Sequence, residues 1–274
     1  MSDSKNPLYK KAQADFMRAR EQAWDEKQRA KYQIILDNLG LCYRLVDIGC
    51  GWGQFLQIAA EQVSEIWGVD ESPDRLRDIE KTCPTAKIKI CSADRMDLPD
   101  DYFDTAVTSQ MLHEVKLFGS ETELAAILQE IHRILRNSGR YILVDHLDSG
   151  EGEVEVFLPG QSLELLKYFA EHYKYYQVNY RINAGGNIII SRRALQDFLT
   201  KIWSFDSPME EMEMNETHNV FNWVESEKFL NGAALTVDRW IEFADIEDDL
   251  NRVGGRLIDS AGWNRKFLCR AVKN

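Results

Sequence analysis

The pattern of hydrophobic and polar residues changes character along the 274-residue chain. From about Leu8 to Leu39, apolar residues recur every three or four positions among Lys, Arg and Glu, which predicts one long helix or two short ones. From Leu41 onward, short apolar runs of strand type alternate with segments of helical period, and this alternation lapses between Ser149 and Leu235. The pattern divides the chain into four expected segments: an N-terminal helical cap (1–40), a core (41–148), an insertion or lid (149–235) and a C-terminal part that completes the core (236–274).

Five strands are predicted in the core segment, with helical segments between them. Strands that alternate with helices form a parallel sheet with helices on both faces, so we expect a doubly wound α/β fold. Ligands of such sheets bind beyond the carboxyl ends of the strands. Four polar residues at or just after these ends should therefore line one rim: Asp47, Asp70, Asp94 and Gln110. The predicted strands are "RLVDIG", "EIWGVD", "KIKICSAD", "FDTAVTSQ" and "RYILVDH".

The insertion after the fifth strand is predicted to be mainly helical. Its first part, "QSLELLKYFAEHYKYYQVNYRI", is rich in aromatic residues, which either wall a substrate pocket or, as is commoner, form the core of the lid. The stretch from Asp206 to Glu216 has five acids and no base, which favours a solvated loop. In the last segment, we expect a helix from Thr236 or Asp238 to Gly254, and then a strand hairpin formed by "GRLIDSAG" and "KFLCRAVK".

Composition and charge narrow the classes of partner and compartment. The formal net charge of -12 disfavours nucleic acid, because such a surface repels phosphates, and favours a small neutral or cationic partner. The sequence contains no run of 18 consecutive apolar residues, so we expect no membrane-spanning helix. Its N-terminus is polar and lacks an apolar segment of signal-peptide type, which argues against export. The five cysteines form no C-x-x-C pair, which indicates reduced thiols in a cytoplasm and neither disulfides nor a structural metal site.

The stretch "LVDIGCGWGQF" carries the most specific chemical signal. Gly49, Gly51 and Gly53 follow a predicted strand and open a helix, and glycine lets a ligand lie directly against the backbone. The spacing G-x-G-x-G differs from the two phosphate-binding loops G-x-G-x-x-G and G-x-x-x-x-G-K-[ST], and no lysine follows to meet a phosphate. A tight diphosphate cradle is therefore not the first interpretation.

Three acids define the ligand further. Asp47, at the mouth of the loop, would repel a diphosphate but suits a cation or an ammonium group. Asp70 lies about 20 residues after Gly49, where an acid accepts both ribose hydroxyls. Asp94 can accept a hydrogen bond from an exocyclic amine, while Arg95 and Met96 can offer backbone contacts to a purine edge. The implied ligand contains a ribose, an aminopurine and a positive charge, and no phosphate.

Together, "VDIGCGWGQF", "GVDES", "SADRMDLPDDYFDTAVTSQMLHEV" and "ILRNSGRYILVD" resemble the successive motifs of class I S-adenosylmethionine-dependent methyltransferases of the small-molecule type. The resemblance covers roughly residues 41–146 and the C-terminal hairpin. It implies a Rossmann-like sheet of seven strands whose last strand is antiparallel, and N-terminal helices that cap the cofactor. It also implies a cofactor-binding set: Asp47, Gly49, Cys50, Gly51, Gly53, Asp70, Glu71, Asp94, Arg95, Met96 and Gln110.

A methyltransferase of this kind moves a methyl group by direct in-line displacement, so its main task is to orient the reactants and exclude water. A base is needed only where the acceptor carries a proton with a high pKa. The best candidate is His113, with Glu114 beside it; the alternative is that His113 only lines the pocket. Asp145 and His146 should also face the rim, and Arg18 or Arg20 of the cap could bind the cofactor carboxylate. No metal spacing is recognisable among the histidines.

Two other functions are compatible with parts of this pattern. A non-catalytic sensor could keep the nucleoside site without turnover, because methyl transfer requires no invariant catalytic residue. A nicotinamide-dependent oxidoreductase would share the fold, but the glycine spacing and Asp47 disfavour it. Within the methyltransferase hypothesis, a macromolecular acceptor also stays open. The leading expectation is a cytoplasmic enzyme that methylates a small molecule.

Overall fold

The structure is a computed structural model that describes residues 15, 16, 19, 26–77, 79–258 and 260–274. Arg18, Arg20 and most of the predicted N-terminal cap lie outside these residues. The chain divides into two compact units. The first, here called the sheet unit, contains α2 (Glu26–Leu36). It comprises the described residues from α2 to Asp145, together with 221–241 and 267–274. The second, here called the small unit, includes 146–220 and 242–266.

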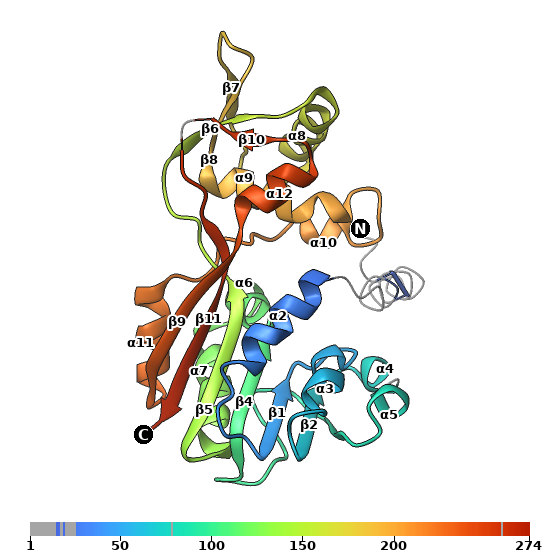
Figure 1. Cartoon of the computed structure of the whole chain (residues 1–274), viewed down its shortest axis with the longest axis vertical. Coiled ribbons are helices and arrows are strands. Elements are labelled where there is room, and N and C mark those ends of the chain that lie inside the picture. Colours follow the sequence, from blue (N-terminus) through green and yellow to red (C-terminus); the bar gives the residue numbers. More distant parts are fainter. Residues whose placement is uncertain (1–14, 17–18, 20–25, 78, 259) are drawn as a thin grey trace. The chain divides into compact units, whose positions relative to one another are not determined.

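A seven-stranded sheet forms the sheet unit, in the order β3-β2-β1-β4-β5-β11-β9 (Figure 1). Its first five strands pair in parallel. The last strand, β11, runs antiparallel to β5, as predicted. The strands are β1 (Arg44–Ile48), β2 (Glu65–Asp70), β3 (Lys87–Ile90), β4 (Phe103–Ser109), β5 (Leu135–His146), β9 (Leu235–Asp245) and β11 (Asn264–Lys273).

Helices flank this sheet, and their sequences explain where they begin. In α7 (Glu121–Ile134), the Ser120 side chain accepts the N–H of Glu123 at 3.1 Å and so caps the helix. The apolar positions of α7 face the core at helical spacing. Residues 73–76 and 79–82 form two short helices, with Pro73 at the first position of the earlier one. The remaining helices are α3 (Gln54–Ala59), α4 (Pro73–Leu76), α5 (Ile79–Thr82), α6 (Leu112–Phe118) and α11 (Trp223–Gly232).

The small unit contains a four-stranded sheet that the sequence analysis did not predict, in the order β10-β6-β8-β7. Helices still contribute more residues than strands to the insertion, as expected. The strands escaped prediction because each spans only two to five residues. The elements are β6 (Glu153–Phe157), α8 (Gly160–His172), β7 (Tyr180–Ile182), β8 (Ile188–Ser191), α9 (Arg192–Lys201), the 3-10 helix η2 (Ile202–Ser204), α10 (Glu210–Glu213), α12 (Ile246–Arg252) and β10 (Arg256–Leu257).

The core of the small unit takes up most of the aromatic residues of the insertion. Phe169 and Phe198 are fully buried, and Tyr173 is buried beside them. Tyr168, Tyr176 and other partly buried side chains pack against this cluster. For these residues, the packing role is therefore the one the structure supports.

The predicted C-terminal arrangement is wrong in two respects. The segment expected to be one helix from Thr236 to Gly254 is β9 followed by α12. The side chain of Asp245 caps α12 by accepting the N–H of Glu247 at 2.9 Å, so the helix begins only there. The expected hairpin does not form, because β10 pairs with β6 in the small unit whereas β11 joins the seven-stranded sheet. Across the part of the chain that the structure describes, no helix has the length and apolar character needed to cross a bilayer.

Candidate functional site

The glycine loop after β1 has the left-handed backbone that its sequence demands. Gly49, Gly51 and Gly53 have φ angles of 73°, 55° and 78°, a region that residues with a side chain rarely adopt. The N–H groups of Gly49 and Cys50 donate to the carbonyl of Val69 at 2.8 and 3.0 Å, which ties the loop to β2.

The three glycines serve different purposes. A Cβ at Gly49 would lie 2.8 Å from the side chain of Met111, and one at Gly53 would lie 2.9 Å from Ile79. A Cβ at Gly51 would meet no atom of the described chain within 4 Å. The first and third glycines are therefore required by packing, whereas Gly51 borders open space where a ligand can approach the main chain.

Asp70, at the end of β2, orders the same loop. One carboxylate oxygen accepts the N–H of Gly51 at 3.0 Å, and the other accepts the N–H of Ser72 at 2.9 Å. A guanidinium nitrogen of Arg75 lies 3.8 Å from the first oxygen. Each carboxylate oxygen can accept two hydrogen bonds, so this side chain can also accept ribose hydroxyls. Glu71, the next residue, is exposed.

Asp47 is a buried carboxyl in β1, only 3% exposed. Burial raises its pKa to about 8, and the charge of Asp70 acts in the same direction, while the ammonium group of Lys31 opposes the shift. Lys31 extends from α2 and donates to the side-chain oxygen of Gln110 at 3.1 Å. An ammonium group bound here would stabilise the ionised form of Asp47, so the position fits a cationic ligand.

The loop after β3 is held by α7. Glu130 accepts the N–H of Met96 at 2.7 Å, and Arg133 donates to the Met96 carbonyl at 2.8 Å. Asp94 and Arg95 are exposed, whereas the Met96 side chain is buried. Asp94 is thus accessible to an amine, but the main chain of Met96 is already hydrogen-bonded within the protein and does not fit the predicted contact to a purine edge.

Cys50 and Gln110, two further residues of the predicted cofactor-binding set, lie in different environments. The thiol of Cys50 is buried, and burial raises its pKa well above the ordinary value, so it behaves as a packing side chain. Gln110, directly after β4, has a positive φ of 54°, and its N–H donates to the carbonyl of Val144 at 2.8 Å. This unusual backbone holds Gln110 at the carboxyl ends of the strands beside Lys31.

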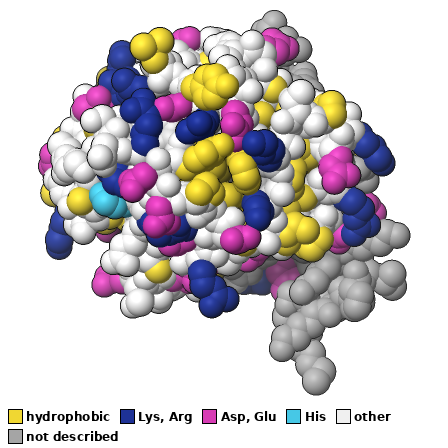
Figure 2. Space-filling view, turned by 90° about the horizontal axis from the view of Figure 1, so that it is seen from below, with side chains coloured by type: hydrophobic (Ala, Val, Ile, Leu, Met, Phe, Trp, Pro, Cys, Tyr) yellow, Lys and Arg dark blue, Asp and Glu magenta, His cyan; other side chains and the backbone are white. Residues whose placement is uncertain are grey.

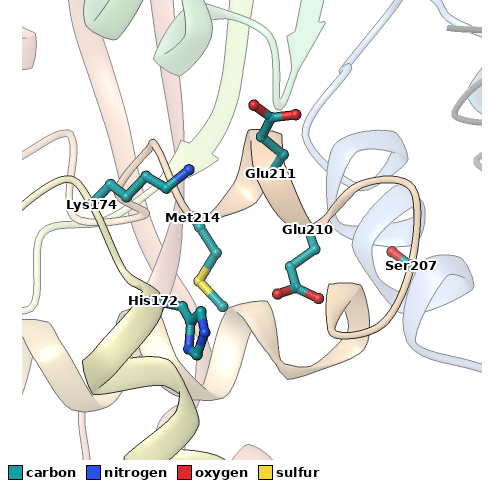
Figure 3. A pocket seen from close by; sticks show the side chains of 6 residues that line it. All are labelled: His172, Lys174, Ser207, Glu210, Glu211 and Met214. Carbon is teal, nitrogen blue, oxygen red and sulfur yellow. The ribbon is translucent and has the colours of Figure 1, made fainter. Parts of the chain in front are cut away.

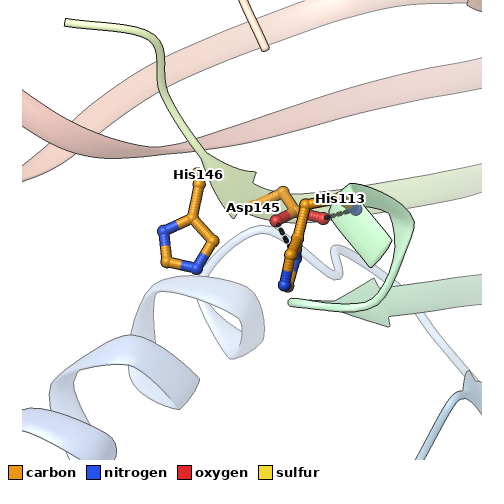
Figure 4. A group of neighbouring side chains, drawn as sticks. All are labelled: His113, Asp145 and His146. Carbon is orange, nitrogen blue, oxygen red and sulfur yellow. Dashed lines mark hydrogen bonds and ion pairs between the residues drawn. The ribbon is translucent and has the colours of Figure 1, made fainter. Parts of the chain in front are cut away.

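A buried histidine–aspartate pair lies at the ends of β4 and β5 (Figure 4). His113 is in the first turn of α6 and 6% exposed, and Asp145 is fully buried near the end of β5. Nδ1 of His113 is 2.8 Å from one oxygen of Asp145, and the His113 N–H donates to the other at 3.1 Å. Asp145 therefore fixes the imidazole with its proton on Nδ1, which directs the basic Nε2 away from the carboxylate.

Asp145 does more than was predicted from the sequence, where it was expected only to face the rim with His146. The sequence did contain a signal for this role. Asp145 lies near the end of the fifth predicted strand and His113 lies just after the fourth, and a carboxylate next to a base can orient it. Glu114 is exposed, next to His113 in α6. His146, the last residue of β5, stacks on His218 of the small unit with ring centroids 4.0 Å apart.

The acidic stretch after Asp206 is not simply solvated. Glu213 and Glu216 are buried, and Nζ of the fully buried Lys201 lies 3.1 and 3.7 Å from them. His218 lies 3.5 Å from both carboxylates. The two glutamates and the histidine could also surround a metal ion, but the lysine ammonium already neutralises charge among them. The prediction that no metal is used stays a prediction.

A cavity of about 300 Å³ lies in the small unit (Figure 3). Both polar and apolar atoms line it, and none of the predicted cofactor residues is among the lining residues. The lining residues are His172, Lys174, Ser207, Glu210, Glu211 and Met214.

The comparisons with known proteins agree with this geometry. Residues 46–143 match the family described as a methyltransferase domain. This part of the chain, from β1 into β5, is therefore similar to a methyltransferase domain. An uncharacterized methyltransferase of Synechocystis sp. is 29% identical to it over 116 residues, which span 42% of this chain and 53% of that relative.

Solved structures show the same fold. An S-adenosylmethionine-dependent methyltransferase from Mesorhizobium loti superposes with a TM-score of 0.56 at 19% identity, covering 89% of this chain and 96% of that one. The 1,6-didemethyltoxoflavin-N1-methyltransferase of Burkholderia thailandensis, with bound 1,6-didemethyltoxoflavin and S-adenosylhomocysteine, has a TM-score of 0.54 at 15% identity, covering 97% and 87%. The chain spans only about half the length of the curated relatives it matches, at 53% and 41%.

Proposed function

We propose that this methyltransferase domain transfers a methyl group from S-adenosylmethionine to a small-molecule acceptor. The observation that carries the proposal is the juxtaposition of Asp47 and Asp70 at a glycine loop with an open position at Gly51. The charge of Asp70, joined by that of Asp47 once an ammonium group favours its ionised form, suits a cationic, phosphate-free nucleoside and repels a diphosphate. This charge pattern also disfavours a nicotinamide cofactor.

Each part of the cofactor has a matching group in this site. Gly51 offers the bare main chain against the methionine end, and Asp47 offers a carboxylate to its ammonium group. Asp70 offers its oxygens to the ribose hydroxyls, and Asp94 offers an exposed carboxylate to the adenine amine. Gln110, held beside Lys31, would lie near the methyl donor.

The sulfonium of S-adenosylmethionine supplies an activated methyl group, so the protein's part is to orient the acceptor and to manage its proton. We assign the base to His113. Asp145 keeps the Nδ1 proton in place, so Nε2 can accept a proton from an oxygen or nitrogen acceptor. The buried aspartate also stabilises the imidazolium that results. Glu114, exposed beside His113, is a weaker candidate for the same role.

The charge of the protein supports a small-molecule acceptor rather than a nucleic acid. On the face shown in Figure 2, Lys and Arg side chains lie among Asp and Glu side chains, with hydrophobic side chains between them. Such a mixture of charges does not favour a phosphate backbone, and the whole chain has a net charge of -12. The Burkholderia thailandensis protein of similar fold is named a 1,6-didemethyltoxoflavin-N1-methyltransferase. The five free cysteines suit a reducing cytoplasm, where we place the protein.

Calorimetry and a transfer assay test the proposal. We expect S-adenosylhomocysteine to bind and NADH to give no heat; the opposite result would identify a nicotinamide enzyme. Incubation with methyl-labelled S-adenosylmethionine and a metabolite extract should label at least one small molecule. Binding of S-adenosylhomocysteine without transfer to any fraction, extended to RNA and protein fractions, would instead support the non-catalytic sensor.

A further inference from the structure

Lys31 connects three parts of the candidate site. It extends from α2, and its Nζ donates to Gln110 at the end of β4 at 3.1 Å. Its positive charge also acts on Asp47 in β1. All three residues belong to the sheet unit. A cation therefore lies where the strand ends and the glycine loop meet, at the position the proposed function assigns to the methionine end of the cofactor.

The charges of the site make such a cation necessary. The methionine end carries an ammonium group and a carboxylate. A bound ammonium group favours the ionised form of Asp47. Asp47 and Asp70 then attract the ammonium group but repel the carboxylate, and both are at most 5% exposed, so water screens the repulsion weakly. Arg75 lies beside Asp70 at 3.8 Å, on the side of the site assigned to the ribose. Among the described residues, Lys31 is the cation whose charge acts on Asp47.

We propose that Lys31 binds the carboxylate of the methionine end and so selects cofactors that carry this group. This inference rests on the proposed function. It assigns to Lys31 the binding of the cofactor carboxylate, which the sequence suggested for Arg18 or Arg20. Lys31 and Asp47 would then form a matched pair that recognises both charges of the amino acid. Nucleosides that lack the carboxylate, such as decarboxylated S-adenosylhomocysteine and 5′-methylthioadenosine, would gain nothing from Lys31.

The competing role for Lys31 is purely local. It could neutralise Asp47 and hold Gln110 without touching the ligand. In that case its removal would alter the binding of every ligand with an ammonium group, whether or not a carboxylate is present. The two roles therefore differ in how the effect of a substitution depends on the ligand.

Calorimetric dissociation constants of three ligands separate these roles. For Lys31→Met, we expect the affinity for S-adenosylhomocysteine to fall about 10- to 100-fold, the range for one charge-assisted hydrogen bond. The affinity for decarboxylated S-adenosylhomocysteine, which keeps the ammonium group, should not fall, and that for 5′-methylthioadenosine should stay within about twofold. Lys31→Arg should retain most of the affinity, since it keeps the charge.

Lys87→Met is the matched control, because Lys87 begins β3 at the opposite end of the strand and pairs with Glu65 at 2.9 Å. It should leave all three affinities unchanged. Equal losses for S-adenosylhomocysteine and its decarboxylated form, or no loss for either, would overturn the role of Lys31 alone. A wild-type protein that binds none of the three ligands would overturn the proposed function itself.

Discussion

Asp145 holds His113 by two hydrogen bonds, one to the ring nitrogen Nδ1 at 2.8 Å and one from the main-chain N–H at 3.1 Å. The second bond fixes the start of α6, and the first fixes the imidazole on it. Because one buried carboxylate makes both bonds, the ring and the helix start are held in a fixed relation to each other. Such rigidity is what an oriented base needs.

Asp145→Asn should therefore impair turnover more than cofactor binding. The amide can accept only one of the two hydrogen bonds, so the tautomer and orientation of His113 are lost. We expect kcat to fall about 10²- to 10⁴-fold, the range for general base catalysis, while the dissociation constant of S-adenosylhomocysteine stays within about threefold. Steady-state kinetics and calorimetry give both values.

The double variant supplies the control for this assignment. If His113 and Asp145 act as one unit, His113→Gln combined with Asp145→Asn will be no slower than His113→Gln alone. Additive losses in kcat would show that the two residues act independently, and full activity of His113→Gln would show that the histidine only lines the pocket.

Asp70→Asn should weaken cofactor binding through the glycine loop. The amide cannot accept from both Gly51 and Ser72, which Asp70 does at 3.0 and 2.9 Å. We expect the affinity for S-adenosylhomocysteine to fall about 10- to 100-fold. Asp104→Asn is the control, since Asp104 accepts the N–H groups of Tyr43 and Arg44 near the start of β1. It should lower the melting temperature without changing the affinity; equal affinity losses in both variants would mean that Asp70 acts only through stability.

The sequence predicted the sheet and the rim because local signals agreed there. The apolar runs of β1 and β2 end in acids, and they are followed by the glycine loop and by a helix with Pro73 at its first position, so pattern and turn chemistry point the same way. The carboxyl ends of parallel strands meet at one edge, which is why Asp47, Asp70 and Gln110 could be placed together without coordinates.

The parts of the fold and of the site that were not predicted depend on contacts that no local pattern encodes. The segment from Leu235 to Asp245 is long enough for a helix, and only its place beside β11 makes it a strand. The hydrogen bonds that bind Met96 to Glu130 and Arg133 join residues more than 30 positions apart. Lys31 likewise reaches Gln110 across 79 positions. Such pairs appear only once the chain is folded.

Gly51→Ala should separate the cost of backbone strain from contact with the cofactor. A side chain at a φ of 55° is strained by about 1 kcal/mol, but a Cβ there meets no protein atom within 4 Å. The variant should therefore fold, with a free energy of unfolding lowered by about 1 kcal/mol, and bind S-adenosylhomocysteine at least 10-fold more weakly because the methyl group occupies ligand space.

Gly150 offers a matched control for this substitution. It has a φ of 77° and equally open surroundings, but lies in the small unit. Gly150→Ala should show a similar loss of stability in urea denaturation and no change in affinity. If Gly51→Ala binds S-adenosylhomocysteine as well as Gly150→Ala does, the ligand does not lie against Gly51.

Asp47 should make the stability of the ligand-free protein depend on pH. Burial raises its pKa from 3.8 to about 8, so between these values the folded protein keeps a proton that the unfolded chain releases. The stabilising contribution is therefore fully present below about pH 4 and is lost as the pH rises through about 8, by at most about 1.4 kcal/mol per pH unit. Urea denaturation at several pH values between 5 and 8 should show a smaller decline in the unfolding free energy for Asp47→Asn than for the wild type. Asp97→Asn, which alters an exposed carboxylate paired with Lys89 at 2.8 Å, should keep the wild-type decline. Parallel curves for Asp47→Asn and the wild type would mean that Asp47 is ionised throughout this range.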